Sequence, residues 1–297
     1  MQQPVSYEGI VREARRPAGW EPPGPVPPGP EGADDLWPAA GEDLCYLTGH
    51  WRVFQRVKGH RYSLDDLATA WFAVTHSDGL PITRHADIGC GIGSVLMMVS
   101  WALPQLTSVG VEAQDLSVGL ARRSVRYNGA TDRITVRHGD LRDPELVPEH
   151  GTFDLVTGTP PYIPVGDGVI SDKEQCGPCR FELRGGIEDY CLTAARLLAP
   201  GGRFYVCQGA AQTRRVELAA EAAGLTILRR RDVVPREGRA ALFSLYQMAR
   251  AEDVPPAPDA VPHAVDPPFI VRDAAGEHTD AYFEIRARMG MPPRRVG

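Results

Sequence analysis

The sequence predicts an α/β fold, in which a mostly parallel sheet of seven strands carries helices on both faces and includes a C-terminal antiparallel hairpin. Past residue 80, short apolar runs of strand length alternate with segments whose apolar residues recur at helical spacing. A glycine-rich turn at 89–93 joins the first run to the first helical segment. The chain has 297 residues, of which 43% are apolar, so it can fill a sizeable core.

The first strand is expected at 85–89, and the helix after it, 93–104, is ended by Pro104. A second strand at 107–113 leads into a helix at 115–129, which Asp115 caps at its start and a glycine closes. The same alternation predicts the later elements: strands at 133–140, 153–158 and 203–208, helices at 186–202 and 213–224, and two closing strands at 225–234 and 241–250.

Composition divides the chain into four parts. Between Pro17 and Pro30, seven of fourteen residues are proline, so residues 1–40 are expected to form a flexible arm outside the core. Residues 41–80 are expected to form a helical cap that leads into the main domain at 81–250. Residues 251–297 are interpreted as a tail that packs on this domain or extends it.

Several classes of protein are disfavoured by composition. The longest apolar stretch, 93–104, is shorter than the roughly 20 residues that a membrane helix needs, and the first residues lack the apolar core of a signal peptide. We therefore expect a cytoplasmic protein with no membrane partner. The net charge is −6, with acidic ends and a slightly basic middle, and no dense basic patch stands out.

Six cysteines in a chain of this size are expected to be reduced thiols. Cys176 and Cys179 form the only CxxC, which could be a redox pair or half of a zinc site. The pair lies in a Gly/Pro-rich loop and has no further ligands near it in sequence. No metal site is predicted.

The turn "DIGCGIG" has glycines at 89, 91 and 93 behind Asp87. Without side chains there, the backbone turns tightly and can approach a ligand next to a helix N-terminus. A tight turn with no ligand is the alternative. Glu112 ends the second strand, where an acidic side chain can accept hydrogen bonds from both ribose hydroxyls of a nucleoside cofactor.

Two nucleoside cofactors fit an acidic residue in this place. A nicotinamide dinucleotide site expects G-x-G-x-x-G, whereas here the spacing is G-x-G-x-G, and Asp87 would repel a pyrophosphate. S-adenosylmethionine has a ribose for Glu112 and an ammonium group that Asp87 can help hold, directly or through the loop. Asp140 follows the third strand and can accept a hydrogen bond from the adenine amino group, because ligands bind outside the carboxyl ends of parallel strands.

The fourth strand ends in "TPPY", residues 159–162. Pro160 and Pro161 fix the backbone, so a carbonyl is held toward the site, and Tyr162 can stack on a flat substrate. An amine conjugated to a ring or a carbonyl is a poor nucleophile. The Thr159 side chain and the proline carbonyl can accept hydrogen bonds from its N–H groups, and no general base is required.

With these motifs the sequence resembles the class I S-adenosylmethionine-dependent methyltransferases, and within them the bacterial tRNA adenine N6-methyltransferases that modify the base beside the anticodon. The resemblance runs from about Phe54 to Met291 and includes "FQRVKGHRYSLDDLATA" and "CRFELRGGIEDYCLTAARLLAPGGRF". It implies a Rossmann-like fold and S-adenosylmethionine as cofactor. By position it implies that the cofactor is bound by Gly89, Gly91, Gly93, Glu112 and Asp140, that Arg61, Ser63 and Asp65 help to close its pocket, and that 159–162 bind the methyl acceptor.

Thr159 departs from the family, which has Asn, Asp or Ser before Pro-Pro-Tyr. A threonine hydroxyl accepts a hydrogen bond on a shorter stem and brings a methyl group. We therefore keep three hypotheses: methylation of adenine N6 in tRNA or another structured RNA, methylation of a protein glutamine amide or a small molecule, and a cofactor-binding module with little or no transfer. The long loop at 163–185 is interpreted as a substrate lid. The oligomeric state is not predicted.

Overall fold

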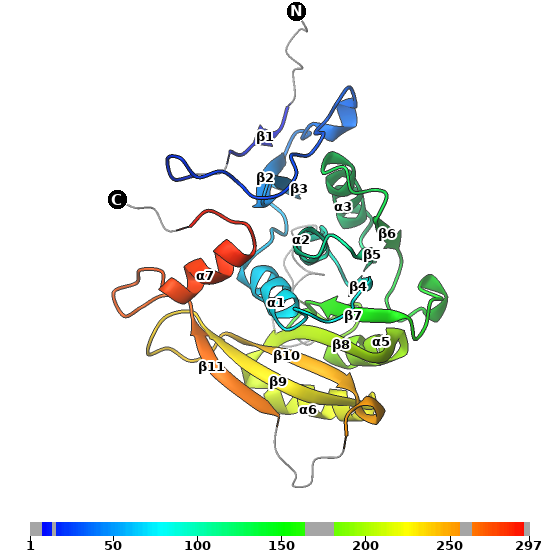
Figure 1. Cartoon of the computed structure of the whole chain (residues 1–297). Coiled ribbons are helices and arrows are strands. Elements are labelled where there is room, and N and C mark those ends of the chain that lie inside the picture. Colours follow the sequence, from blue (N-terminus) through cyan, green and yellow to red (C-terminus); the bar gives the residue numbers. More distant parts are fainter. Residues whose placement is uncertain (1–7, 14–15, 164–180, 256–262, 294–297) are drawn as a thin grey trace, which may run out of the picture.

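The computed structural model describes residues 8–13, 16–163, 181–255 and 263–293. Its centre is an eight-stranded sheet with the order β11-β9-β10-β8-β7-β4-β5-β6 (Figure 1). These strands are β4 Arg84–Ile88, β5 Thr107–Glu112, β6 Ile134–His138, β7 Phe153–Gly158, β8 Leu198–Gly209, β9 Leu225–Val234, β10 Phe243–Arg250 and β11 Ala264–Ile270.

The expected fold class is confirmed. The neighbours from β6 to β8 are all parallel, and β10 is antiparallel to both β8 and β9, which gives the expected hairpin. The strand count is eight rather than seven, because β11 from the C-terminal tail adds to the sheet edge in parallel with β9. This strand was not predicted because its sequence contains two adjacent prolines. They are tolerated because β11 is an edge strand and its register with β9 shifts between Asp266 and Phe269.

Helices cover both faces of the sheet. On one face lie α1 (Leu64–Thr75), α2 (Ser94–Ala102) and α3 (Asp115–Tyr127), and on the other lie α5 (Ile187–Leu197) and α6 (Thr213–Ala222). The C-terminal helix α7 (Asp280–Arg288) packs beside α1 (Figure 1). Asp115 is the first residue of α3 and Gln114 is its N-cap, one residue earlier than expected.

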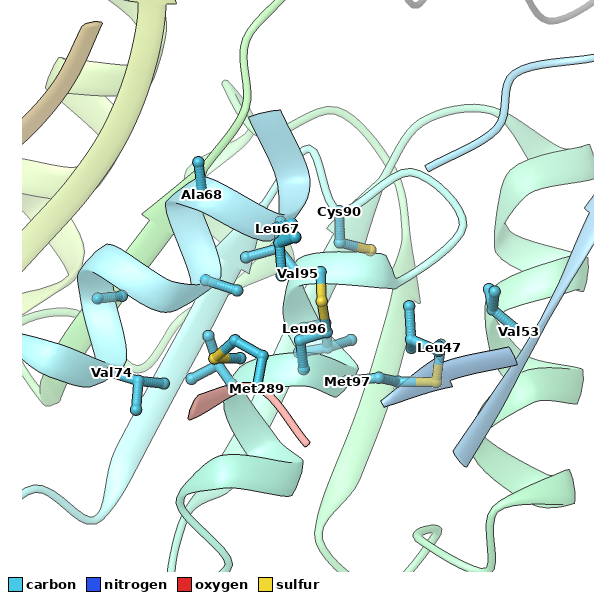
Figure 2. Close-up of a cluster of buried hydrophobic side chains, with 14 of the residues drawn as sticks. Leu47, Val53, Leu67, Ala68, Val74, Cys90, Val95, Leu96, Met97 and Met289 are labelled. Atoms are coloured by element: carbon cyan, nitrogen blue, oxygen red, sulfur yellow. The ribbon is translucent and has the colours of Figure 1, made fainter. Parts of the chain in front are cut away.

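The larger core lies between α1, α2 and the segments around them. Figure 2 shows Leu67 and Val74 of α1 facing Val95 and Leu96 of α2, with Met289 from the C-terminal end of the chain at the same cluster. All of these side chains are buried. Apolar burial of this kind stabilises the fold by about 25 cal/mol per Å² and fixes α1 and α2 beside the strand ends.

Residues 41–80 are not the helical cap that the sequence predicted. They are helical only in α1, and before it β2 (Glu42–Thr48) and β3 (Trp51–Arg56) form an antiparallel hairpin. A short strand β1 (Ile10–Val11) joins β2 in parallel. The hairpin is almost wholly buried, and β3 packs on α3. Its buried residues include polar ones such as Asp43 and Gln55, so the sequence lacks the apolar–polar alternation that identifies an exposed hairpin.

The Pro-rich segment lies along α3. The Gly29 N–H donates to the carbonyl of Tyr127 at 3.2 Å, and the guanidinium of Arg123 donates to the carbonyl of Trp37 at 2.8 Å. These contacts place the expected arm on the body of the protein. Downstream, β11 and α7 show the C-terminal tail extending the domain.

Candidate cofactor and acceptor site

The carboxyl ends of β4, β5, β6 and β7 meet at one edge of the sheet, where a cavity of about 480 Å³ opens. All the predicted cofactor-binding and acceptor residues line this cavity, except Asp87 and Gly93. Those that line it are Arg61, Ser63, Asp65, Gly89, Gly91, Glu112, Asp140, Thr159, Pro160, Pro161 and Tyr162. The structure therefore brings together in one cavity the predicted cofactor residues and the predicted acceptor corner, residues 159–162.

The glycine turn has a separate reason for each glycine. All three have positive φ, +68° at Gly89, +56° at Gly91 and +81° at Gly93. A Cβ on Gly89 would lie 2.0 Å from the hydroxyl oxygen of Tyr190, whereas a Cβ on Gly91 would meet nothing within 4 Å. Gly91 thus faces open space, and Gly93 serves as the N-cap of α2.

Tyr190, on α5, was not identified from the sequence. It is 5% exposed, lines the cavity and packs against both Gly89 and Gly158. Only the helical spacing of its segment is visible in the sequence, and that spacing cannot show which strand ends the ring will reach.

Glu112 connects the glycine turn to the end of β5. Its Oε2 accepts a hydrogen bond from the Gly91 N–H at 2.9 Å, and its Oε1 accepts one from the Gln114 N–H at 2.6 Å. Each carboxylate oxygen has a second lone pair. Glu112 can therefore hold the turn in place and still accept hydrogen bonds from a diol in the cavity.

Asp87 lies behind the cavity wall, and it is only 1% exposed. The Thr157 hydroxyl donates to its Oδ1 at 2.7 Å, and its Oδ2 has no hydrogen-bond partner among the described residues. Burial raises the pKa of Asp87 to about 7. Asp87 does not line the cavity, so of the two expected routes to a ligand the structure leaves only the one through the loop.

His85 extends this buried chain away from the cavity. Its Nε2 lies 2.9 Å from the Thr157 hydroxyl, and its Nδ1 lies 3.2 Å from the Ser108 hydroxyl. Burial lowers the pKa of His85 to about 3, so the ring is neutral. Because Thr157 gives its only proton to Asp87, it accepts from His85, which assigns the proton of the ring to Nε2.

Asp66 is an acidic residue of the cavity that the sequence did not predict. Its Oδ2 accepts from the Ser63 N–H at 2.8 Å and its Oδ1 accepts from the Ser94 hydroxyl at 2.8 Å. Burial, together with the charge of Asp65, raises the pKa of Asp66 to about 7, and Asp66 lines the cavity. The available signal was the S-x-x-D capping box at the start of α1.

Two predicted residues of the segment before α1 are engaged by the protein. The Arg61 guanidinium donates to the buried carboxylate of Asp43 at 2.7 Å, and the Ser63 hydroxyl donates to Asp65. Their polar groups therefore shape the wall of the cavity.

Asp140 pairs with Arg142. Its Oδ1 accepts from Nε of Arg142 at 2.9 Å, and its Oδ2 accepts from Nη2 at 2.5 Å. The hydrogen bonds from Arg142 lower the pKa of Asp140, which keeps this carboxylate ionised. It remains partly exposed at the cavity and has lone pairs left for a donor.

The acceptor corner, 159–162, follows β7 directly. The Thr159 hydroxyl has no hydrogen-bond partner among the described residues. The Tyr162 hydroxyl lies 3.2 Å from Oδ2 of Asp65 and 3.0 Å from Sγ of Cys207, and burial raises its pKa well above the usual range. With its hydroxyl engaged, Tyr162 offers the cavity its ring and backbone, as stacking on a flat substrate requires.

Two features expected from the sequence fall wholly or mostly outside the described residues. These are the Cys176–Cys179 pair and the loop between Ile163 and Phe181. Within the described part of the chain, no group of three or more His, Cys, Asp or Glu could hold a metal ion. No helix in that part is long and apolar enough to span a bilayer.

A family model described as a methyltransferase domain matches residues 86–164, the stretch that contains the glycine turn, Glu112, Asp140 and the Thr159 corner. The chain contains an S-adenosylmethionine-dependent methyltransferase domain. This finding confirms the resemblance inferred from the motifs, at the level of cofactor and reaction type.

The methyltransferase domain has several curated relatives. A release factor glutamine methyltransferase of Bradyrhizobium diazoefficiens is 32% identical over 180 residues, covering 58% of this chain and 57% of that protein. A 4-amino-L-phenylalanine/4-methylamino-L-phenylalanine methyltransferase of Streptomyces pristinaespiralis is 33% identical over 199 residues, covering 57% and 65%. A tRNA1(Val) (adenine(37)-N6)-methyltransferase of Porphyromonas gingivalis is 28% identical over 141 residues, covering 46% and 54%.

These matches span a little over half to two thirds of the relatives' own lengths. Among solved structures, a protein from Agrobacterium tumefaciens described as a predicted O-methyltransferase superposes with a TM-score of 0.58 at 19% identity. That match covers 78% of this chain and 100% of the other. It supports the class I methyltransferase fold.

The cavity of the methyltransferase domain fits its cofactor, S-adenosylmethionine. Asp65, Asp66 and Glu112 line it. Asp87 lies behind it, and one of its buried oxygens has no hydrogen-bond partner within the described part of the chain. Burial raises the pKa of both Asp66 and Asp87, and the charge of Asp66 adds to the shift of Asp87. A ligand that carries positive charge therefore makes the ionisation of these carboxylates less unfavourable. Gly91, with open space above it, lets the backbone approach that ligand.

Proposed function

We propose that the protein is an N-methyltransferase that methylates the exocyclic N6 amine of an adenine in tRNA. The observation that carries this proposal is the position of Thr159–Tyr162 in the same cavity as the glycine turn and Glu112. A corner with two prolines, a hydroxyl and an aromatic ring suits a flat acceptor whose nitrogen lies close to the cofactor.

In this proposal Glu112 binds the ribose of the cofactor, Asp140 binds the adenine amino group, and the turn at 89–93 surrounds the methionine end. Arg61, Ser63 and Asp65 close the pocket on the side of α1. The cofactor supplies a methyl group on positively charged sulfur, which a nitrogen lone pair can attack. The acidic groups around the turn favour binding of this cation.

The acceptor corner has to make a planar nitrogen nucleophilic. The Thr159 hydroxyl and the carbonyl of Pro160 accept hydrogen bonds from the two N–H groups, which draws the nitrogen lone pair out of conjugation as the nitrogen becomes tetrahedral. Pro160 and Pro161 fix these acceptors in advance, so little ordering is left to occur during the reaction. The surplus proton then leaves from a positively charged nitrogen, so the residues of the corner need not act as a base.

Cationic side chains at the cavity favour RNA over an uncharged acceptor. Arg61 and Arg184 line it. Arg61 is already paired with Asp43, whereas Arg184 is exposed. Phosphates beside the target nucleotide can be bound by such groups while the base is flipped out of its stack against Tyr162. The Porphyromonas gingivalis relative, named for adenine N6 methylation in tRNA, supports the same acceptor.

A protein glutamine amide is the second candidate. The release factor methyltransferase of Bradyrhizobium diazoefficiens is matched over a longer stretch than the tRNA enzyme and at higher identity. An amide nitrogen is planar too, so the same corner could present it. A small aromatic amine is the corresponding alternative that the Streptomyces pristinaespiralis relative suggests.

One experiment separates these acceptors. The protein is incubated with labelled S-adenosylmethionine and, in parallel, with unmodified tRNA, a peptide-chain release factor and 4-amino-L-phenylalanine. Our proposal predicts N6-methyladenosine in the digested tRNA and little label in the other two. If only the release factor or only the amino acid is labelled, that molecule is the acceptor and the proposal of tRNA is wrong. The third hypothesis predicts that wild type binds the cofactor but transfers no methyl group, and that Thr159→Asn does transfer one. This result would indicate a cofactor-binding module that is inactive in its natural form.

A further inference from the structure

Arg215, the third residue of α6, lies outside the cavity and uses every donor it has. A guanidinium has five N–H groups. Its Nη1 donates to Oε1 of Glu182 at 2.7 Å and to Oε1 of Gln212 at 3.1 Å. Its Nη2 donates to Oε2 of Glu182 at 2.8 Å and to Oε2 of Glu188 at 2.7 Å, and its Nε donates to Oε1 of Glu188 at 2.7 Å. Both glutamates are thus held by two parallel hydrogen bonds.

The third partner, Gln212, connects this arginine to the acceptor corner. Its side-chain Nε2 donates to the backbone carbonyl of Tyr162 at 2.5 Å, while its Oε1 accepts from Arg215. The amide of Gln212 is therefore oriented by the guanidinium, and the carbonyl of Tyr162 is held by that amide. Tyr162 is fixed at its other end through its hydroxyl, beside Asp65 and Cys207.

Glu182 belongs to a segment that also touches the corner. Its N–H donates to the carbonyl of Ile163 at 3.0 Å, and Ile163 forms an isolated β-bridge with Phe181. The side chain of Glu182 is only 9% exposed, so its charge depends on Arg215 for compensation. One guanidinium thereby ties Tyr162, by way of Gln212, to the residues that pair with Ile163.

Gly186 lies against the Arg215–Glu182 pair, where a residue with a side chain would not fit. A Cβ on Gly186 would lie 2.7 Å from Nη2 of Arg215 and 2.8 Å from Oε2 of Glu182. Glu188 lies in the first turn of α5, and α5 and α6 lie side by side on one face of the sheet (Figure 1). Arg215 therefore connects α5, α6 and the acceptor corner, and the absence of a side chain at Gly186 makes space for it.

We propose that Arg215 is a positioning residue for methyl transfer, which sets the backbone of the Thr159–Tyr162 corner through Gln212 without touching substrate or cofactor. This inference rests on the proposed N-methyl transfer at that corner. The hydrogen-bond acceptors of the corner are its Thr159 hydroxyl and Pro160 carbonyl, and a shift of the backbone at Tyr162 moves both relative to the cavity. Lysine cannot replace the arginine, because it has three donors and no planar fork.

The test compares Arg215→Lys with Arg214→Lys. Arg214 is the neighbouring residue of α6, is exposed and pairs only with Glu217 among the described residues, so it is a matched control. For Arg215→Lys we expect kcat to fall by about 10- to 100-fold. The dissociation constant for S-adenosylmethionine and the urea midpoint should change little, and Arg214→Lys should behave as wild type. An unchanged kcat in Arg215→Lys would overturn the proposal.

A second variant, Gln212→Leu, removes the link to Tyr162 and leaves both glutamate pairs in place. It should reproduce the loss of kcat, and the double variant with Arg215→Lys should lose little more, because both changes break one chain of contacts. If the fold-loss of kcat in the double variant equals the product of the two single losses, Arg215 and Gln212 do not act through one chain of contacts, and the proposal is contradicted. If Arg215→Lys proves unstable, Gln212→Leu alone decides the proposal.

Hydrogen exchange separates this inference from the proposed function. If wild type methylates none of the acceptors, the proposed function fails, and exchange in peptides covering 153–163 still tests the contact. Faster exchange there in Arg215→Lys and Gln212→Leu, but not in Arg214→Lys, would support the role of Arg215 in fixing the corner. Equal exchange in all four proteins would overturn it.

Discussion

The Thr157 hydroxyl donates to Oδ1 of the buried Asp87 carboxylate at 2.7 Å, across the register of β7 and β4. Thr157→Val should remove that donor and destabilise the protein by about 1–3 kcal/mol at pH 8. The loss should be smaller at pH 5, where Asp87 is protonated. Urea denaturation at both pH values measures this, with the exposed Thr135→Val as control. Equal losses at both values would contradict the assignment.

The contribution of Asp66 and Asp87 to the stability of the ligand-free protein should fall as pH rises from about 4 to about 7. It opposes the contribution of His85, whose lowered pKa favours folding as pH rises through the same range. Burial raises the pKa of both Asp66 and Asp87 to about 7 in the folded state. At these two positions the folded protein therefore binds more protons than the unfolded chain within this window. Ionising each group in the folded state costs on the order of 2–4 kcal/mol. Urea denaturation of wild type and Asp87→Asn at pH 5 and pH 8 isolates this effect, because both proteins contain His85. The stability of wild type relative to Asp87→Asn should be lower at pH 8 than at pH 5, and a difference that is the same at both values would contradict the shift.

Cofactor affinity should depend on pH in the opposite sense. Because Asp66 and Asp87 gain negative charge as pH rises from 6 to 8, a positively charged ligand should bind more tightly at the higher pH. Titration calorimetry with S-adenosylmethionine measures this slope. S-adenosylhomocysteine, which lacks the charge on sulfur, should show a weaker slope, and Asp66→Asn should weaken binding about tenfold and reduce the slope. Identical slopes for both ligands would show that these carboxylates do not respond to the charge.

Two glycine substitutions should have different effects. In Gly89→Ala the new Cβ would lie 2.0 Å from the Tyr190 hydroxyl, so the turn or α5 must move, and we expect a loss of both stability and cofactor affinity, of roughly 2 kcal/mol or more. Gly91→Ala meets no atom within 4 Å, so its cost is the strain at φ +56° and the obstruction of the cavity. It should weaken cofactor binding more than stability. Thermal unfolding and calorimetry on both variants decide this.

The sheet and its site were largely predictable because their signals are local. Strand-length apolar runs and helical spacing located β4 to β10, and the rule that ligands bind at carboxyl ends of parallel strands placed Gly91, Glu112 and Thr159 together. The β2–β3 hairpin was missed because both faces are buried and its sequence carries no clear alternation. β11 was missed because its prolines argue against a strand.

Contacts between distant segments were beyond the reach of the sequence. Asp87 was expected to help hold the ligand either directly or through the loop, and the choice depends on its burial beneath the turn, where β7 brings Thr157 beside it. Asp66 was missed because the sequence alone does not distinguish it from Asp65, the adjacent aspartate that was chosen instead. Tyr190 and Arg215 act through positions set by packing of α5 and α6 on the sheet, which no local pattern encodes.

The most direct measurement is methyl transfer to tRNA by wild type and Thr159→Val, with nucleoside mass analysis and cofactor affinity determined in parallel. Valine keeps the shape of threonine and removes the hydroxyl that accepts the hydrogen bond. We predict N6-methyladenosine with wild type, a loss of transfer of about 10- to 100-fold in Thr159→Val, and an unchanged dissociation constant for S-adenosylmethionine. Transfer that is equally fast in Thr159→Val, or a methyl group on carbon or oxygen, would contradict it.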